Sequence, residues 1–145
     1  MTPPRFALGS RLRFWQCCLL LWTGFAGAGR RTQGGGRTAA AKAADKLHAR
    51  GVQTVILTLG ARGAFVATTE VRQLVPGFKV KAVDTTAAGD IFNGALAGAL
   101  AEGQDLIQAV RVPNAASAIS VTRMGAQPSA STRKEIERLL RSTAG

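Results

Sequence analysis

Residues 84–94, Asp-Thr-Thr-Ala-Ala-Gly-Asp-Ile-Phe-Asn-Gly, place a run of small side chains where a loop passes into an apolar helix. The helix is predicted from about Ile91 to Ala101, and Gly103 ends it. Backbone N–H groups at a helix start are unpaired and carry partial positive charge, so a phosphate could approach them closely here. Asp90 would lie beside that anion and could accept a proton from an attacking hydroxyl. The spacing alone only suggests this chemistry, and taken by itself it favours an acid-capped helix start.

The segments before this stretch read as strands. Val52–Leu59 is a β-branched apolar run, typical of a buried strand in an α/β sheet. Ala64–Thr68 and Val71–Val75 predict a hairpin, which follows a glycine-bounded turn at 60–63. Phe78–Val83 alternates apolar residues with two lysines, and this alternation predicts a half-exposed strand.

Helices are predicted on both sides of these strands. Thr38 can cap a helix over Ala39–Arg50 that stops at Gly51. A further helix spans Leu106–Val121, with a kink expected at Pro113. Ser131 or Thr132 caps a last helix, Arg133–Leu140. Helices that flank apolar strands indicate the α/β class.

The first 37 residues differ from the remainder. The chain has 145 residues and a formal charge of +11, with 19 Lys+Arg against 8 Asp+Glu. Residues 1–50 hold nine basic residues and one acid, a net of +8, which leaves +3 for residues 51–145. We therefore expect two parts, a basic and apolar arm at 1–37, poorly ordered, and a folded domain at 38–145. The arm fits either a nucleic-acid or membrane contact or a segment without selected function.

Several function classes are excluded by composition. No apolar run reaches the roughly 18 residues that a bilayer-spanning helix needs. The adjacent Cys17 and Cys18 cannot form a disulfide framework or a four-ligand zinc site. His48 is the sole histidine, which excludes a metal centre built from several histidines.

The motifs at 84–100 resemble a known family. DTTAAGDIFNGALAGAL is similar to the second signature of the PfkB-type carbohydrate kinases. TLGARG at 58–63, VPGFKVKAVDTTAAGD at 75–90 and AISVTRMGAQPS at 118–129 resemble the ribokinase branch of that family, in the same order. The likeness covers roughly Thr38 to Leu140. It implies a partial ribokinase-like three-layer α/β/α fold, namely the C-terminal ATP-binding half without the N-terminal sugar-binding half and its lid.

The resemblance also implies roles for individual residues. Asp90 matches the catalytic base, which contacts the sugar substrate and the nucleotide. The amides of an anion hole are matched by Ala87, Ala88 and Gly89. Positions that bind the nucleotide are Thr58, Leu59, Gly60, Ala61, Arg62, Gly63, Gly89, Asp90 and Asn114, the last near the adenine. Positions around an activating monovalent cation are Asp84, Thr86, Ser120, Arg123, Gly125 and Ser129.

Several of these residues also have purely structural interpretations. Asp84 could form an Asx turn, and Ser120 and Ser129 could cap helices. The glycines of the turn could serve only to reverse the chain before the hairpin. Phe78, Phe92 and Met124 are assigned to packing.

The implied activity is ATP-dependent phosphorylation of D-ribose to ribose 5-phosphate, with Mg²⁺ and K⁺. The family setting further implies a cytoplasmic protein, with ATP and a pentose as partners and no nucleic-acid or membrane partner. Complete members are homodimers, which is doubtful for this chain. The alternatives are a non-catalytic nucleotide-binding remnant and a binding module built on the basic arm.

The likeness stops upstream of about Thr23, which predicts a frameshift, a misplaced start or a truncated gene. The sugar-binding half is not in the sequence, so we expect little or no ribose phosphorylation by this chain alone. An exposed sheet edge and aggregation are further expectations.

Overall fold

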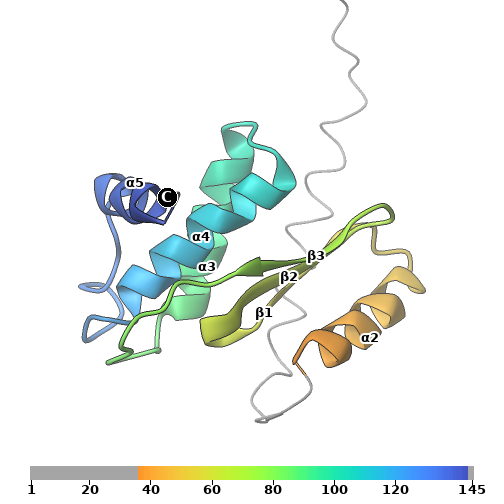
Figure 1. The fold of residues 1–145 in the computed structure, drawn as a ribbon, viewed down its shortest axis with the longest axis horizontal. Coiled ribbons are helices and arrows are strands. Elements are labelled where there is room, and N and C mark those ends of the chain that lie inside the picture. Colours follow the sequence, from red (N-terminus) through yellow and green to blue (C-terminus); the bar gives the residue numbers. More distant parts are fainter. Residues whose placement is uncertain (1–35, 144–145) are drawn as a thin grey trace, which may run out of the picture.

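The computed structural model describes residues 36–143, and the arm predicted at 1–37 lies almost wholly outside them. The described part is built from a small sheet and four α-helices (Figure 1). In chain order its elements are α2 (Gly36–His48), β1 (Val55–Thr58), the 3₁₀ turn η3 (Gly60–Arg62), β2 (Gly63–Ala67), β3 (Arg72–Pro76), α3 (Ala88–Ala101), α4 (Leu106–Ser120) and α5 (Arg133–Ser142).

The three strands form one antiparallel sheet in the order β1-β2-β3. Val55 lies opposite Ala67 in the first pair, and Ala67 lies opposite Arg72 in the second. The hairpin predicted from the sequence is therefore confirmed to within one residue at each end. β1 is shorter than the predicted strand at 52–59, and it occupies an edge of the sheet within the described part of the chain.

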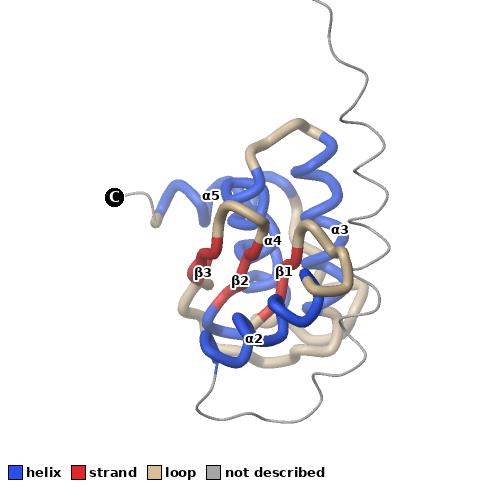
Figure 2. The backbone as a smooth tube through the Cα atoms, turned by 90° about the vertical axis from the view of Figure 1, so that its right-hand side faces the viewer, coloured by secondary structure: helices blue, strands red, loops and turns tan. Residues whose placement is uncertain are grey.

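Alternate side chains of the sheet pack against different helices. Val55 and Phe65 face α2, where they form a core with Ala44 and other residues of that helix. Ala64 and Val66 face the other way and pack with residues of α3 and α4. The result is three layers, with α2 on one face of the sheet and the α3–α4 pair on the other (Figure 2). The predicted α/β/α architecture is confirmed.

The helix ends follow the signals in the sequence. Glycines with positive φ come shortly after two helices, Gly51 at +88° after α2 and Gly103 at +76° after α3. Thr132 and Glu135 form a reciprocal capping box at the start of α5. α4 continues through the buried Pro113, which therefore does not end it. Within the described residues, no helix is long and apolar enough to cross a membrane.

Two expectations differ from the structure. α2 begins at Gly36, inside the arm predicted at 1–37, rather than at Ala39. Residues 78–83 form an irregular connection instead of a strand. Their alternation has another cause, because Phe78, Val80 and Ala82 line a cavity whereas Lys79 and Lys81 do not.

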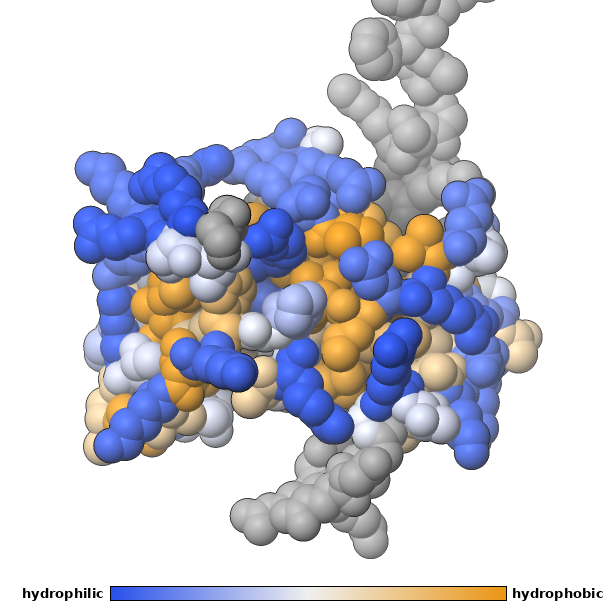
Figure 3. Space-filling model, viewed as in Figure 1, coloured by the Kyte–Doolittle hydropathy of each residue, from blue (hydrophilic) through white to orange (hydrophobic). Residues whose placement is uncertain are grey.

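The surface seen in the orientation of Figure 1 is hydrophilic around its rim (Figure 3). Apolar residues gather in the middle of this face, between the hydrophilic residues over α5 and those over α2. Met124, predicted to be a packing residue, is instead 75% exposed, whereas Phe92 is buried as predicted.

Candidate functional site

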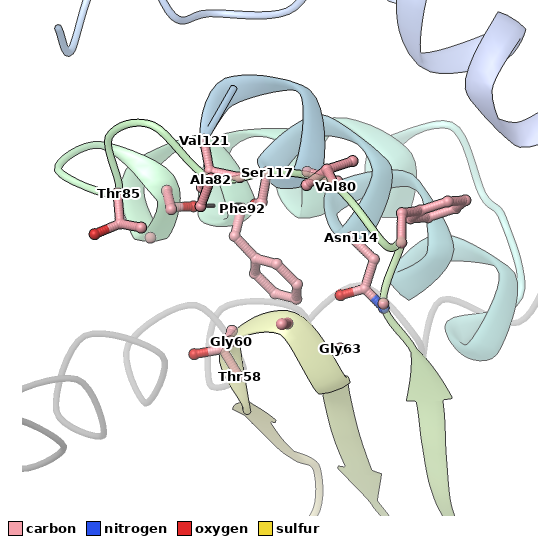
Figure 4. Close-up of a pocket in the computed structure, with 16 residues that line it drawn as sticks. Thr58, Gly60, Gly63, Val80, Ala82, Thr85, Phe92, Asn114, Ser117 and Val121 are labelled. Atoms are coloured by element: carbon pink, nitrogen blue, oxygen red, sulfur yellow. Dashed lines mark hydrogen bonds between the residues drawn. The ribbon is translucent and has the colours of Figure 1, made fainter. Parts of the chain in front are cut away.

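A cavity of about 370 Å³ lies between the sheet and the α3–α4 pair (Figure 4). One side, which we call the turn wall, is formed by residues 58–63 and by Gly77 after β3. The other side, which we call the helix wall, is formed by residues 85–89 at the start of α3 and by neighbouring residues of α4. The sequence-predicted site residues that line the cavity are Thr58, Gly60, Ala61, Gly63, Ala88, Gly89 and Asn114.

The glycines of the turn wall differ in what a side chain at each position would contact. Gly63 has φ +98°, and a Cβ on it would lie 2.1 Å from the carbonyl oxygen of Val75. Gly77 meets the same turn, because its Cβ would lie 2.7 Å from the oxygen of Ala61. Gly60 has φ +61° and open space around its missing Cβ. Gly63 and Gly77 thus permit contact between two backbone segments, and only Gly60 leaves room for a ligand.

Asn114 connects the two walls from α4. Its Nδ2 donates hydrogen bonds to the carbonyl oxygens of Val75 at 3.1 Å and Pro76 at 3.2 Å. The residue is only 6% exposed, yet its Oδ1 accepts no hydrogen bond from the described residues. The close-up shows this oxygen on the side of the cavity where Phe92 lies (Figure 4). The donor half of the amide therefore holds β3, and the acceptor half is available to a ligand.

The helix wall presents free backbone donors. The N–H of Ala88 donates to the carbonyl of Thr85 at 3.3 Å, and that of Ile91 donates to Ala87 at 3.0 Å. Between them, the N–H groups of Gly89 and Asp90 have no acceptor among residues 36–143. Ser117 of α4 fixes this helix start, because its hydroxyl donates to the carbonyl of Ala88 at 3.0 Å. Free amides and the helix dipole together suit an anion.

Asp90 stands in the first turn of α3 and is exposed. Its carboxylate makes no hydrogen bond or ion pair with the described residues, and it is not part of the cavity lining. It directly follows Gly89, which does line the cavity. The carboxylate is thus uncommitted, and Asp90 adjoins the cavity lining in the chain.

Two loops meet beside the helix wall, and Asp84 joins them. Asp84 Oδ1 accepts from the N–H of Thr86 at 2.9 Å and from the hydroxyl of Thr86 at 2.5 Å. Its Oδ2 accepts from the N–H of Gly125 at 3.0 Å. These hydrogen bonds hold the pKa of Asp84 below its ordinary value, with the Thr86 hydroxyl as the largest cause. The loop that leads into α3 is therefore tied to the loop after α4.

The remaining predicted cation positions lie at the end of α4 and in the loop that follows it. Ser120 and Ser129 are buried, and their hydroxyls are 3.1 Å apart. Ser129 also donates to the carbonyl of Ala126 at 2.7 Å. Arg123 turns to α5, where it forms an ion pair with Glu135 and donates to the carbonyl of Ala130. Backbone hydrogen bonds from Thr132 and the contact with Arg123 lower the pKa of Glu135 to about 2.

Several predicted residues lie outside the cavity lining, and several lining residues escaped prediction. The predicted residues that do not line it are Leu59, Arg62, Ala87, Asp90, Asp84, Thr86, Ser120, Arg123, Gly125 and Ser129. The lining residues that sequence reasoning missed are Gly77, Phe78, Val80, Ala82, Thr85, Phe92, Ser117, Ala118 and Val121. The alternation at 78–83 is a signal for part of this lining, but the same pattern also predicts a half-exposed strand.

The residues around the cavity fit a nucleotide. Apolar side chains and glycines line most of it, and its polar groups include the free oxygen of Asn114, the free amide of Gly89 and the side chains of Thr58, Thr85 and Ser117. Metal ligands are less evident, because residues 36–143 contain no cluster of three His, Cys, Asp or Glu side chains. A Mg²⁺ ion at this site would therefore depend on the oxygens of a bound phosphate chain.

Comparison with known proteins agrees with this geometry. The family model described as pfkB family carbohydrate kinase matches residues 20–133. A ribokinase of Haemophilus influenzae is 50% identical over 96 residues, which cover 66% of this chain and 31% of that protein. The crystal structure of ribokinase from Thermotoga maritima superposes with a TM-score of 0.67 at 52% identity. That match covers 69% of this chain and 34% of the Thermotoga protein.

A structure of a putative ribokinase II from E. coli in complex with ATP and Mg²⁺ is also similar, with a TM-score of 0.67 and 32% identity. It covers 70% of this chain and 33% of the E. coli protein. The chain thus spans about a third of the length of the relatives that it matches. On the match over residues 20–133, the chain belongs to the pfkB family of carbohydrate kinases.

Proposed function

We propose that the chain binds ATP in this cavity and forms the nucleotide-binding part of a ribokinase-type sugar kinase. The observation that carries the proposal is the arrangement of polar groups along the cavity. Thr85, next to the free helix amides, and Asn114 lie at opposite ends, with Phe92 between them (Figure 4). A nucleotide has the same order of groups, with a polar base edge, flat apolar faces and an anionic tail.

The Asn114 end suits the base. The free Oδ1 can accept a hydrogen bond from an exocyclic amino group, which adenine carries. Phe78, Val80 and Phe92 supply apolar surface for the faces of the ring. The resemblance of Asn114 to a position near the adenine in ribokinases supports the same orientation.

The helix wall suits the phosphates. The free N–H of Gly89 lines the cavity, and the N–H of Asp90 follows it in the same turn. Such donors stabilise negative charge that develops on a transferring phosphoryl group. Ala87 and Ala88, predicted to share this role, contribute differently, because Ala87 is buried outside the cavity lining and the amide of Ala88 already donates to Thr85. We assign the anion hole chiefly to Gly89 and Asp90.

Asp90 is the proposed catalytic base. Its carboxylate has no hydrogen-bond or ion-pair partner among the described residues. Both oxygens are therefore available to accept a proton from a sugar hydroxyl beside the cavity. ATP would supply the γ-phosphoryl group, and the 5-hydroxyl of D-ribose would attack it. The preference for ribose rests on the relatives, since an Arabidopsis thaliana ribokinase has been solved with ribose and ATP.

The proposal includes a divalent and a monovalent cation, and a different relative supports each. A divalent metal is supported by the E. coli relative solved with ATP and Mg²⁺. A monovalent cation is supported by a Vibrio cholerae fructokinase double mutant solved with potassium. The oxygen donors for potassium would come from the two adjoining loops, at Asp84, Thr86, Ser120, Arg123, Gly125 and Ser129. Hard oxygen donors suit such an ion, and Asp84 keeps acceptor capacity beyond its three hydrogen bonds. The family setting supports a cytoplasmic location.

A second candidate function is nucleotide binding without turnover. The chain spans about a third of its relatives, and Asp90 does not line the cavity. Phosphoryl transfer also requires the sugar hydroxyl to be positioned beside the nucleotide, and the lining of the cavity among residues 36–143 accounts for the nucleotide alone. We therefore expect ATP binding and little ribose-dependent ADP release from this chain alone.

Calorimetric titration with ATP and Mg²⁺ tests the proposal. Ala88→Asp places a carboxylate at the start of α3, where it stabilises the helix and repels phosphate. We expect it to weaken ATP binding by about tenfold or more, which is about 1.4 kcal/mol. Ala101→Asp puts the same side chain at the far end of α3 and should leave affinity unchanged. Equal affinities of both variants and the parent, or no binding by any, would reject the proposal.

A further inference from the structure

The start of α3 is not capped by a side chain. Its N-cap residue is Ala87, and no side chain of the described residues caps the helix there. By contrast, Asp105 caps α4 by accepting a hydrogen bond from the N–H of Ile107 at 3.1 Å. A capping side chain ordinarily accepts from the second or third amide of its helix, which in α3 belong to Gly89 and Asp90. A cap of the usual kind would therefore occupy the two amides that the proposed anion hole needs.

The first turn of α3 is held from its carbonyl side instead. Ser117 of α4 donates its hydroxyl proton to the carbonyl oxygen of Ala88 at 3.0 Å (Figure 4). A serine inside a helix ordinarily donates to a carbonyl one turn back in the same helix. Ser117 instead reaches a residue 29 positions earlier in the chain. This hydrogen bond ties the start of α3 to α4 and leaves the amides of α3 free.

The carbonyl of Ala88 and the N–H of Gly89 belong to one peptide unit. The peptide bonds of the described residues are all trans, so these two groups point in opposite directions. A contact that fixes the direction of the carbonyl therefore also fixes the direction of the N–H. Gly89 lines the cavity, and its N–H has no acceptor among residues 36–143. Ser117 thus sets the direction of a donor that it does not contact.

The same hydrogen bond makes the N–H of Gly89 a stronger donor. Linked hydrogen bonds polarise one another, because a carbonyl that accepts a hydrogen bond draws electron density from the N–H of its own peptide unit. Ser117 is half-buried between the buried Ala116 and Ala118, which limits the competition of water for its hydroxyl. Its single hydroxyl proton is committed to Ala88, so Ser117 has none to donate to a phosphate.

We propose that Ser117 is a positioning residue of the anion hole, which directs and strengthens the N–H of Gly89 through the carbonyl of Ala88. The inference rests on the proposed nucleotide function of the cavity and adds a residue that acts on the phosphates alone. The base end of the cavity depends on other groups, chiefly the free Oδ1 of Asn114. Ser117 stands among alanines in the sequence, and its role appears only when α3 and α4 pack together.

The ratio of ATP affinity to adenosine affinity tests the proposal. The two ligands share the base and the ribose, and only ATP has phosphates, so the ratio isolates the helix wall. Ser117→Ala should weaken the binding of ATP with Mg²⁺ by about fivefold or more and leave the binding of adenosine unchanged. Ser117→Thr keeps the hydroxyl and should restore the ratio of the parent. Ser142→Ala removes a hydroxyl that donates to the carbonyl of Leu139 within α5, and this control should change neither affinity.

Amide NMR of the free chain tests the orienting step without a ligand. The nitrogen chemical shift of an amide responds to hydrogen bonding at the preceding carbonyl, because both belong to one polarisable peptide unit. Ser117→Ala should therefore move the nitrogen shift of Gly89 more than that of Asp90, and Ser142→Ala should move neither. Alanine is a strong helix former, so Ser117→Ala should remain folded, which circular dichroism checks.

The possible failures can be distinguished. If the parent binds ATP, the proposal is overturned by an equal ratio for the parent and Ser117→Ala, or by a Ser117→Thr ratio as low as that of Ser117→Ala. A parallel loss of ATP and adenosine affinity would show a structural role only and would overturn it as well. An unmoved Gly89 shift in Ser117→Ala would overturn the orienting step whether or not a nucleotide binds. No ATP binding by the parent would reject the proposed function of the cavity, and the role of Ser117 in it would fall too.

Discussion

The two walls of the cavity are held in place by different forces. In the turn wall, Gly63 and Gly77 bring backbone segments so close that no side chain could fit between them. In the helix wall, the hydrogen bonds that Asp84 accepts and the one that Ser117 donates fix the loop and the helix start. The turn wall therefore depends on the absence of side chains, and the helix wall depends on the presence of particular ones.

The motifs of the two walls look alike in the sequence, but they have different roles. The turn wall sets the shape of the cavity, and the helix wall supplies its hydrogen-bond donors. Glycines at both walls matched nucleotide-binding positions, yet Gly63 contacts protein backbone and Gly89 carries a free N–H into the cavity. The turn wall should respond to substitution through stability, and the helix wall should respond through binding. The predictions below follow this distinction, in decreasing order of their expected effect on the free energy of unfolding.

Gly63→Ala should have the largest effect. The new Cβ would lie 2.1 Å from the oxygen of Val75, at a φ of +98° that alanine rarely adopts. We expect a loss of roughly 4 kcal/mol or more, measured by chemical denaturation. Gly60→Ala is the matched control, because its Cβ meets open space and only the positive φ of +61° opposes it. Its loss should be about 1–2 kcal/mol, and an equal loss for the two variants would contradict the backbone-contact account.

Asn114→Ala should come next. The change removes two hydrogen bonds to the carbonyls of Val75 and Pro76 in a largely buried environment. We expect about 1–3 kcal/mol of destabilisation. Asn114→Asp keeps the shape and loses the donors, so it should destabilise the protein comparably. If Asn114→Asp were as stable as the parent, the donor role of Asn114 would be wrong.

Acid should loosen the helix wall through Asp84. Its pKa is lowered in the folded protein, chiefly by the Thr86 hydroxyl, so its carboxylate stabilises the fold above the unfolded pKa near 3.8. That contribution is lost as the pH falls through the folded pKa. Denaturation midpoints from pH 5 downward should fall less steeply for Asp84→Asn than for the parent. Glu135, whose pKa is lowered from 4.5 to about 2, loses its own contribution over an overlapping range of pH in both proteins, so the difference between the two slopes reports Asp84. Parallel slopes for the two proteins would contradict the Asp84 link.

Asp90→Asn should have the smallest effect on stability, within about 0.5 kcal/mol, because this exposed side chain has no partner among the described residues. Any ribose-dependent ADP release by this chain should fall by roughly 10²- to 10⁴-fold on the same change. Asp105→Asn, at the N-terminal cap of α4, is a control for which we expect the opposite result. It should lower stability and leave turnover in place.

Local signals in the sequence predicted much of this fold. The hairpin follows from two β-branched runs around Thr69-Glu70, and α5 follows from the Thr132–Glu135 capping box. Gly51 and Gly103 marked the helix ends correctly. These features depend on residues close in the chain, so a reading of short windows could find them.

Features that depend on distant contacts were not predictable. The period of two at 78–83 is real, but it arises from a cavity wall rather than from a strand partner. The function of Gly63 depends on Val75 and Gly77, which no local pattern connects with it. The double role of Asn114, as a donor to β3 and a free acceptor in the cavity, likewise appears only when α4 is packed against the sheet.

Titration of the isotopically labelled chain with ATP and Mg²⁺, followed by amide NMR, tests the central claim most directly. The account predicts that the largest shifts occur at Gly89 and Asp90, with a second group at Gly60 and the side-chain amide of Asn114. The amide of Gly103, beyond the other end of α3, should stay in place. Shifts confined to exposed arginines and lysines, or none near the start of α3 at saturating nucleotide, would contradict it.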